Sequence, residues 1–400
     1  MANGSAAAVV DVFDYATGMW SIAWLSEARG RIGATTLGTK AYFGGGTGYS
    51  RAVDIYDSVT GNWTSALLSV GRDGVAAAAA GTKVLFGGGC EGGGCSKHSN
   101  VVDIYDTVSG DWSVAQLSQS RDSHAAASAG PKILFGGGFN YTVTKIVDIY
   151  DTSTGKWSIS QLSVWRAWLS ATGVGDIAVF AGGYTLQAYE SRVDIYNSTS
   201  NSWSTAELSQ PRCSIATAVV GNKLIFAGGE ISKYTPSTTV ETYDVESRSW
   251  TTVRMKFARS SGVASSAGSV VMIASGTSSS VVEMYDTVSG TLISDCKFSN
   301  VSVSSNCTLI CGVGTEVVHD TIIRGGISGS CPVYTQQNCS INDSCNSTIG
   351  YPSNCTLSEW GSWSICDLAC SSNKSSVGTS YRFRNVTSSV CLRYSLCFCP

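Results

Sequence analysis

Hydrophobic and polar positions along the first 295 residues follow a pattern that repeats about every 45 residues. Each unit begins with a run of small apolar residues, as in GVAAAAAG at 74–81. A second apolar run ends in glycines. The segment that follows it, such as VVDIYDTVSGDW at 101–112, begins with alternating apolar and polar residues and continues with residues typical of a turn. Alternation with a period of two predicts β-strands, and helical spacing appears nowhere with comparable regularity. We therefore expect four short antiparallel strands per unit, as in a β-propeller blade.

Six tryptophans recur along these units, each followed nine positions later by an arginine, and only the last complete unit has GTLISD (290–295) where a tryptophan is expected. A residue needed once per blade at the same place is most simply structural, so we interpret these arginines as hydrogen-bonding groups between blades. The recurring acids Asp54, Asp103, Asp148 and Asp194 are interpreted in the same way. The rings of the recurring tyrosines and tryptophans are expected to fill the space between blades. The pairs are Trp20 and Arg29, Trp63 and Arg72, Trp112 and Arg121, Trp157 and Arg166, Trp203 and Arg212, and Trp250 and Arg259.

The order of these markers resembles the kelch repeat family, which has a glycine pair, a tyrosine and a tryptophan, with an arginine before the next first strand. The resemblance covers residues 9 to about 295 and implies a kelch-type β-propeller that binds a partner through one face. Six repeats are complete over about 29–295, whereas 9–23 supplies only third and fourth strands. Residues 312–326 have the form of the missing strands, so we predict a seven-bladed propeller over 1–326, with six blades as the alternative. Closure by both ends of the chain would remove exposed sheet edges.

Cysteine usage changes at residue 296, because three of the 15 cysteines precede it and twelve lie between 296 and 399. That density, together with many N-x-[ST] sequons, indicates an oxidising compartment, so we predict a secreted or cell-surface glycoprotein. The start, MANGSAAAVV, lacks a signal-peptide pattern, and we expect the N-terminus to be incomplete. The sequons begin at Asn62, Asn140, Asn197, Asn300, Asn306, Asn338, Asn342, Asn346, Asn354, Asn373 and Asn385.

Residues 357–400 contain the pattern W-x-x-W-S-x-C-x-x-x-C followed by R-x-R, which resembles a thrombospondin type 1 repeat. The resemblance implies a small module in which tryptophans and arginines interleave and disulfides compensate for a small core. An unspecified disulfide-rich module is the alternative, and 327–356 is interpreted as a glycosylated linker. The residues that carry the resemblance are Trp360, Trp363, Cys366, Cys370, Arg382 and Arg384.

Composition argues against several functions. Charged residues make up 14% of the chain and the net charge is −3, so there is no basic surplus to bind nucleic acid or an anionic membrane. No apolar stretch approaches the roughly 18 residues of a membrane span, and we expect no membrane insertion. Some extracellular kelch proteins resemble galactose oxidase, whose copper needs paired histidines, and the three histidines here offer no close pair. We predict a protein that is not an enzyme and needs no cofactor, with a secreted oxidase or another enzyme as the alternative.

Residues 87–98, GGGCEGGGCSKH, combine three residue types that bind metals, namely Cys90, Cys95 and His98. In an oxidising compartment we favour a local Cys90–Cys95 disulfide that braces a long loop, and we predict no metal. Cys213 has no obvious partner and is expected to be a buried thiol.

Binding residues are expected where the repeats differ. The loops between second and third strands vary in length and carry aromatic residues, and the position two residues after each arginine also varies. In kelch propellers both sets line one face, and aromatic residues and arginine dominate interface energetics. We predict a recognition module for a protein or glycan, with a structural matrix component as a further alternative. The predicted binding residues are Arg31, Tyr49, Ser123, Phe139, Tyr141, Trp168, Tyr184, Ser214 and Ser261, and Tyr189 and Tyr234 belong to the same loops.

Overall fold

The computed structural model describes residues 6–274, 276 and 281–293, and four further strands between residues 315 and 398. The chain divides into two compact units, Met1–Ser294 and Asp295–Pro400. Within the described residues the only helical element is a short 3-10 turn, η1 (Gly93–Cys95), so the predicted all-β class is confirmed. No helix among these residues is long and apolar enough to cross a membrane.

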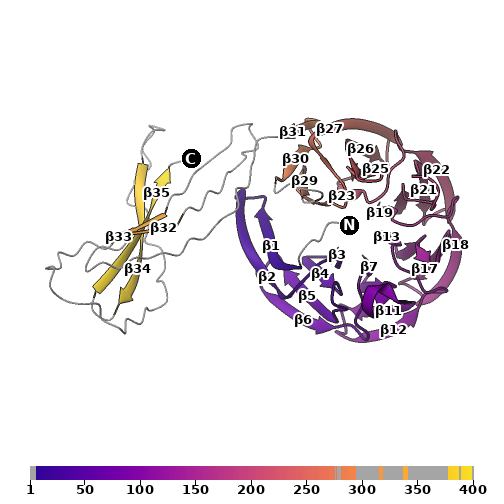
Figure 1. Ribbon diagram of the computed structural model, residues 1–400, viewed down its shortest axis with the longest axis horizontal. Coiled ribbons are helices and arrows are strands. Elements are labelled where there is room, and N and C mark those ends of the chain that lie inside the picture. The colour runs from indigo at the N-terminus through magenta and orange to yellow at the C-terminus, as the bar shows by residue number, and fades with distance from the viewer. Residues whose placement is uncertain are drawn as a thin grey trace. The chain divides into compact units, whose positions relative to one another are not determined.

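Six antiparallel sheets form a ring of blades in the first unit, and the first strand of each blade lies innermost (Figure 1). In every blade consecutive core strands pair, which is the blade topology expected from the sequence. The strands of blades one to three are β3 (Gly33–Leu37), β4 (Lys40–Gly44), β5 (Ala52–Asp57) and β6 (Trp63–Leu67); β7 (Ala76–Ala80), β8 (Lys83–Gly87), β11 (Val101–Asp106) and β12 (Trp112–Gln116); and β13 (Ala125–Ala129), β14 (Lys132–Gly136), β17 (Ile146–Asp151) and β18 (Lys156–Gln161).

Blades four to six continue the ring, and the fifth blade has an additional short strand, β25 (Glu230–Ser232). Short loop strands also follow the second strands of blades two and three. These are β9 (Cys90–Glu91), β10 (Lys97–His98), β15 (Phe139–Asn140) and β16 (Thr142–Val143). The core strands of blades four to six are β19 (Ser170–Val174), β20 (Ile177–Ala181), β21 (Arg192–Asn197) and β22 (Ser202–Glu207); β23 (Ala216–Val220), β24 (Lys223–Ala227), β26 (Thr235–Asp244) and β27 (Ser249–Arg259); and β28 (Val263–Ala267), β29 (Val270–Ala274), β30 (Glu283–Asp286) and β31 (Thr291–Ile293).

Neighbouring blades pack through glycines at the ends of second strands. A Cβ at Gly87 would lie 2.7 Å from the ring of Phe135 in the next blade, so a larger residue cannot stand there. Gly136 has the same relation to Phe180. The hydrophobic cores accordingly form between blades, as was predicted for the tyrosines and tryptophans. The core between blades two and three contains Leu85, Val102, Ile104, Phe135, Tyr150 and Trp157.

An N-terminal hairpin of β1 (Ala7–Asp14) and β2 (Met19–Arg29) lies between blades six and one. On one side, the Tyr15 ring occupies the space where a side chain at Gly268 would lie. On the other, the backbone N–H of Ser26 donates to the Asp54 carboxylate of blade one at 3.2 Å. Within the described strands β1 pairs with β2 alone, and Trp24 of this hairpin is 64% exposed. The hairpin therefore occupies a seventh position in the ring with two strands.

The predicted seventh blade is not confirmed. The described part of 312–326 is β32 (Thr315–Val318), which pairs with β33 (Gln337–Ser340). It belongs to a second-unit sheet in the order β32-β33-β35-β34, whose other strands are β34 (Val377–Val386) and β35 (Ser389–Phe398). The expected pairing of 312–326 with 9–23 is not among the pairings of the described strands. Cys366, Cys370, Trp360, Trp363 and six of the eight tail sequons lie outside the described residues, whereas Asn338 lies in β33 and Asn385 in β34.

Candidate functional site

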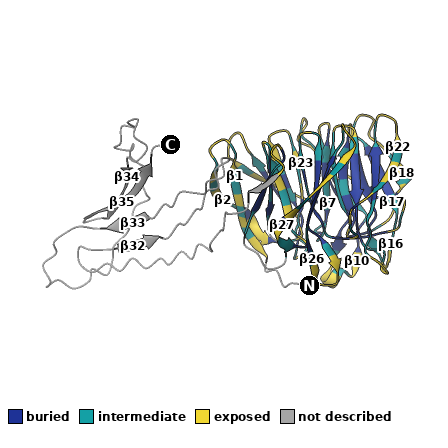
Figure 2. Ribbon diagram, turned by 90° about the horizontal axis from the view of Figure 1, so that it is seen from above, coloured by how far each residue is buried: buried dark blue, intermediate teal, exposed yellow. Residues whose placement is uncertain are grey.

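One edge of the propeller collects all the variable loops. Because the four strands of a blade are antiparallel, the connection from one blade to the next and the loop between second and third strands emerge at the same edge. β10 and β16, which belong to these loops, lie at the same edge in the side view (Figure 2). We call this edge the loop face. The turns between third and fourth strands, which hold Asn62 and Asn197, lie at the opposite edge.

The positions two residues after the repeat arginines form a backbone ladder on the loop face. The N–H of Trp168 donates to the Ser123 carbonyl at 2.9 Å, and the N–H of Ser214 donates to the Trp168 carbonyl at 2.9 Å. Ser261 continues the ladder onto Ser214 at 3.1 Å, and Gly74 donates to Arg31 at 3.2 Å. All members have a left-handed backbone, with φ between 51° and 66°. The members are Arg31, Gly74, Ser123, Trp168, Ser214 and Ser261.

Aromatic rings from neighbouring blades meet in a continuous row beside this ladder. The Trp168 ring lies 5.9 Å from Phe139 and 6.3 Å from Tyr184. His98 extends the row from the second blade, with its ring centroid 5.2 Å from that of Tyr141. Tyr141 is 79% exposed and Trp168 is 39% exposed, so the row presents apolar surface to solvent. We call the following residues the aromatic row: Tyr141, His98, Phe139, Trp168, Tyr184 and Tyr189.

The far end of the aromatic row is anchored in blade five. The Tyr189 hydroxyl donates to the Glu230 carboxylate at 2.8 Å. Desolvation, reinforced by Glu230, raises the pKa of Tyr189 above its ordinary value, so the phenol stays protonated and keeps this hydrogen bond at neutral pH. The sequence placed Phe139, Tyr141, Trp168 and Tyr184 in the site, but not His98 or Glu230, which join it only through contacts between blades. Tyr49 lies in the corresponding loop of blade one, and Tyr234 in that of blade five is 74% exposed.

Buried ion pairs fix the loops from beneath. Arg166 is fully buried and its guanidinium lies 2.6 Å from Asp194, while it also donates to the carbonyls of Phe180 and Arg192. Burial lowers the pKa of Arg166, and the Asp194 carboxylate opposes that shift. Blades five and six have glutamates where the earlier blades have aspartates. The six pairs are Arg29–Asp54, Arg72–Asp103, Arg121–Asp148, Arg166–Asp194, Arg212–Glu241 and Arg259–Glu283.

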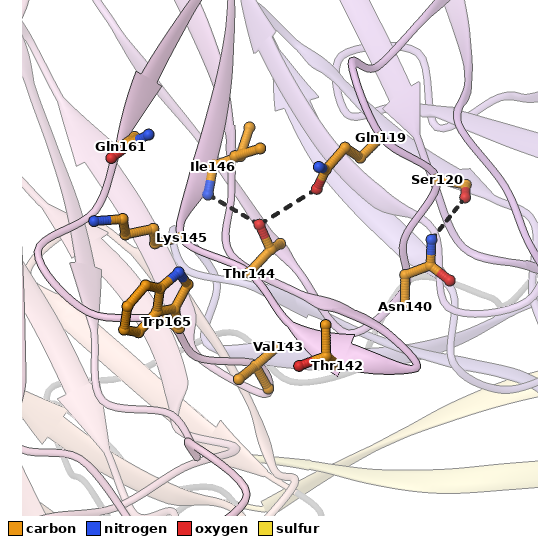
Figure 3. A pocket seen from close by; sticks show the side chains of 10 residues that line it. All are labelled: Gln119, Ser120, Asn140, Thr142, Val143, Thr144, Lys145, Ile146, Gln161 and Trp165. Atoms are coloured by element: carbon orange, nitrogen blue, oxygen red, sulfur yellow. Dashed lines mark hydrogen bonds between the residues drawn. The ribbon is translucent and has the colours of Figure 1, made fainter.

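A shallow pocket of about 580 Å³ opens beside the β15–β16 hairpin (Figure 3). Its wall combines amides, hydroxyls and one aromatic platform, Trp165, which is 58% exposed. The Lys145 ammonium lies 5.0 Å from the Trp165 ring centroid. A second pocket of about 470 Å³ also reaches Trp165, so this ring stands between two hollows. The sequon residue Asn140 lines the first pocket and donates from its amide nitrogen to the Ser120 hydroxyl at 3.0 Å.

The cysteine loop of blade two lies next to the aromatic row through His98. The structure joins Cys90 and Cys95 by a disulfide. Asp122 from the next inter-blade connection approaches both sulfurs, a proximity that sequence spacing did not indicate. Cys213 is buried and free, and burial raises the pKa of its thiol.

Comparisons with known proteins agree with this architecture. Residues 211–254 match the family model described as Kelch motif. The chain is similar to a solved structure titled "Structure of YjhT", with a TM-score of 0.55 and 16% identity over 67% of this chain and 97% of that one. A segment of 80 residues is 32% identical to Spondin-1 of Gallus gallus, which covers 19% of this chain and 9% of that protein. The chain thus matches less than a tenth of that relative's length. The kelch motif and the β-propeller fold are confirmed.

Proposed function

We propose that this protein is a recognition module that binds a protein or glycan ligand through the loop face. Its kelch motif and β-propeller fold support this proposal. The observation that carries the proposal is the aromatic row, which joins rings from blades two, three and four into one surface. Exposed rings that are ordered by their neighbours contribute much contact area at a small entropic cost. The backbone ladder and the buried ion pairs hold these loops in place before any ligand binds.

The pocket beside the aromatic row supports the same surface. An indole ring next to amide, hydroxyl and ammonium groups offers a stacking platform and hydrogen bonds to a polar ligand, and the Lys145 ammonium also suits an acidic group on it. Trp165 supplies the platform, while Gln119, Thr144 and Gln161 supply the polar groups. This pairing favours a glycan at the pocket, alone or as part of a glycoprotein that also covers the aromatic row.

Two substitutions separate the aromatic row from the pocket. Trp168→Ala removes the centre of the row and Trp165→Ala removes the platform of the pocket, and both residues are exposed, so folding should be retained. The matched control is Val108→Ala, because Val108 is 79% exposed at the opposite edge. We expect binding to glycan arrays and to cell-surface protein libraries to fall at least tenfold in one or both tryptophan variants and not in the control. Equal binding in all three variants would refute the loop face as the binding surface.

Three finer features belong to the same proposal. We infer a secreted or cell-surface location from the cysteine and sequon density, and a thrombospondin-like module over 357–400 from its tryptophan, cysteine and arginine pattern. A seventh blade would give the open edge of β1 a pairing partner. Mass spectrometry of disulfide-linked and glycosylated peptides tests the first two features. Amide exchange along β1 tests the third feature. Pairing with β2 alone protects every second amide of β1, whereas pairing on both edges would protect consecutive amides.

A further inference from the structure

Four side chains that bind metals converge beneath the loop face. Cys90 and His98 stand directly opposite each other on β9 and β10, and Cys95 lies in η1 between them. Asp122 comes from the connection between blades two and three. One ligand atom from each of the four lies within 4.8 Å of all the others. Three of the four residues lie in one loop, and the packing of the next blade brings in the fourth, Asp122.

A disulfide accounts for the two cysteines but not for the Asp122 carboxylate beside them. In the oxidised form neither sulfur carries a hydrogen, yet the Asp122 carboxylate lies 3.2 Å from Cys90 Sγ and 3.6 Å from Cys95 Sγ. Asp122 is 7% exposed, and its Oδ1 has no hydrogen-bond partner. His98 Nδ1 lies 3.6 Å from Oδ1, beyond hydrogen-bond distance. A buried carboxylate with an unpaired oxygen is costly, and a cation among these atoms would lower that cost.

We propose that, when Cys90 and Cys95 are reduced, these residues together with His98 and Asp122 bind one Zn²⁺. In a tetrahedral zinc site with bonds of roughly 2.0 to 2.3 Å, ligand atoms lie about 3.3 to 3.8 Å apart. The observed distances are 3.7 Å from Cys95 Sγ to His98 Nδ1 and 3.6 Å from His98 Nδ1 to Asp122 Oδ1. The distances from Asp122 to the sulfurs, 3.2 and 3.6 Å, involve the other carboxylate oxygen, Oδ2, so one oxygen faces the sulfurs and the other faces the imidazole. Thiolate and imidazole ligands also suit zinc better than magnesium or calcium.

The proton and charge balance of the step is simple. A thiol or phosphine reductant supplies the two electrons that break the Cys90–Cys95 S–S bond, and two protons complete the thiols. When zinc binds, both S–H bonds break, two Zn–S bonds form and two protons go to solvent. Zn²⁺ with two thiolates, one carboxylate and a neutral imidazole has a net charge of −1. The Arg31 guanidinium, which pairs with Asp73 at 3.1 Å, also attracts Asp122 electrostatically and partly offsets that charge.

Backbone pairing already holds the ligands in position. Cys90 pairs with Asp73, and Asp122 pairs with Phe139, through reciprocal hydrogen bonds of 2.8 and 3.0 Å. The His98 ring stands edge-on to Phe139 and Tyr141, which limits its rotation. Reduction therefore requires mainly that the two sulfurs separate by side-chain rotation. Since zinc and the disulfide need the same sulfurs, the two states exclude each other.

The test uses the full-length chain and reads each cysteine separately, because reduced tail cysteines also bind zinc. The protein is reduced with a phosphine, exposed to buffered micromolar Zn²⁺ or to Mg²⁺, and labelled with N-ethylmaleimide, and the labelled peptides are quantified. We expect Zn²⁺ to slow labelling of Cys90 and Cys95 at least tenfold, with no effect of Mg²⁺. Labelling of the buried Cys213 in the same sample reports whether the propeller remains folded.

Variants test the two ligands that are not cysteines. Asp122→Asn and His98→Gln should each lose most of the protection by zinc. Asp111→Asn is the matched control, because Asp111 is an exposed aspartate in the turn between β11 and β12 and is not a member of the cluster. Absence of zinc protection in the folded wild-type protein, or full protection in both ligand variants, would overturn the proposal. The wild-type comparison decides the matter if a variant fails to fold, and neither result depends on the recognition function.

Discussion

Replacing Arg166 with methionine should lower the free energy of unfolding by about 3 to 5 kcal/mol. Arg166 is fully buried and donates to Asp194 at 2.6 Å, to the Phe180 carbonyl at 3.1 Å and to the Arg192 carbonyl at 2.9 Å. Methionine has similar bulk, so the loss is mainly electrostatic. It leaves the Asp194 carboxylate with the Ser163 N–H as a donor at 2.9 Å but without its cationic partner. The Phe180 and Arg192 carbonyls each lose one donor, and the Arg192 carbonyl still accepts from the Gly182 N–H at 3.0 Å. The uncompensated charge of the buried carboxylate therefore accounts for most of the loss.

An exposed ion pair in the same blade gives the matched control. Arg192 lies 3.4 Å from Glu207, and their side chains are 37% and 57% exposed. Arg192→Gln should therefore cost no more than about 1 kcal/mol. The substitution keeps the backbone carbonyl of residue 192, so Arg166 retains its hydrogen bond.

Urea unfolding followed by circular dichroism measures both variants, and a double-mutant cycle isolates the pair. Arg166→Met combined with Asp194→Leu removes both charges, so the double variant should be more stable than the sum of the single losses by about 1 to 3 kcal/mol. A loss below about 1 kcal/mol for Arg166→Met, or strict additivity in the cycle, would refute the view that these pairs stabilise the blade connections.

Three further predictions use other parts of the propeller. Burial, with a contribution from Arg121, lowers the pKa of His124 to about 3, so the unfolded chain binds this proton more readily and stability falls as the pH drops from about 6.5 towards 3. At pH 5 the free energy of unfolding should be about 2 kcal/mol lower than at pH 7.5 because of His124. Urea unfolding at the two pH values should show that His124→Gln removes this difference, and an unchanged difference in the variant would contradict the prediction. Gly137 and Gly175 both have positive φ, but only a Cβ at Gly137 would meet backbone, 2.7 Å from the Arg166 carbonyl oxygen. Gly137→Ala should therefore lower the free energy of unfolding by about 1 to 3 kcal/mol more than Gly175→Ala. Equal losses in the two variants would count against a steric cause. In a secreting host, glycopeptide mass spectrometry should find Asn62, which is exposed, more fully glycosylated than Asn140, whose amide is engaged by Ser120; the reverse order would show that the Asn140 loop opens.

The repeats made most of the propeller predictable, because strand alternation, glycine ends and regularly spaced tryptophans and arginines are local properties. The aromatic row was predictable only in part. Phe139 and Trp168 were recognisable as variable loop residues, but their contact depends on how far one blade is rotated from the next. Asp122 was invisible as a partner of Cys90, since 32 residues separate them. The repeat does contain one clue. In blades two to five the residue after an arginine forms a β-bridge with the residue after a glycine pair, as Asp73 does with Cys90.

For the seventh position of the ring, the sequence pattern identified candidate strands but not their pairing partners. The form of 312–326 matched the missing strands, yet form alone does not choose between two partners with free edges. The described part of 312–326, β32, pairs with β33, a partner that the sequence pattern did not indicate. Repetition in the sequence identifies which strands are alike and does not determine which of them meet.

The backbone ladder on the loop face has a consequence for how this protein can change. Its hydrogen bonds join main-chain atoms, so the side chains at Arg31, Ser123, Trp168, Ser214 and Ser261 take no part in holding it together. Arginine, serine and tryptophan already occupy equivalent places with nearly the same φ. The side chains at these positions can therefore be substituted at little cost to the free energy of folding, and each substitution changes the chemistry of the loop face. The ladder makes the propeller a natural scaffold for directed evolution of new binding specificities.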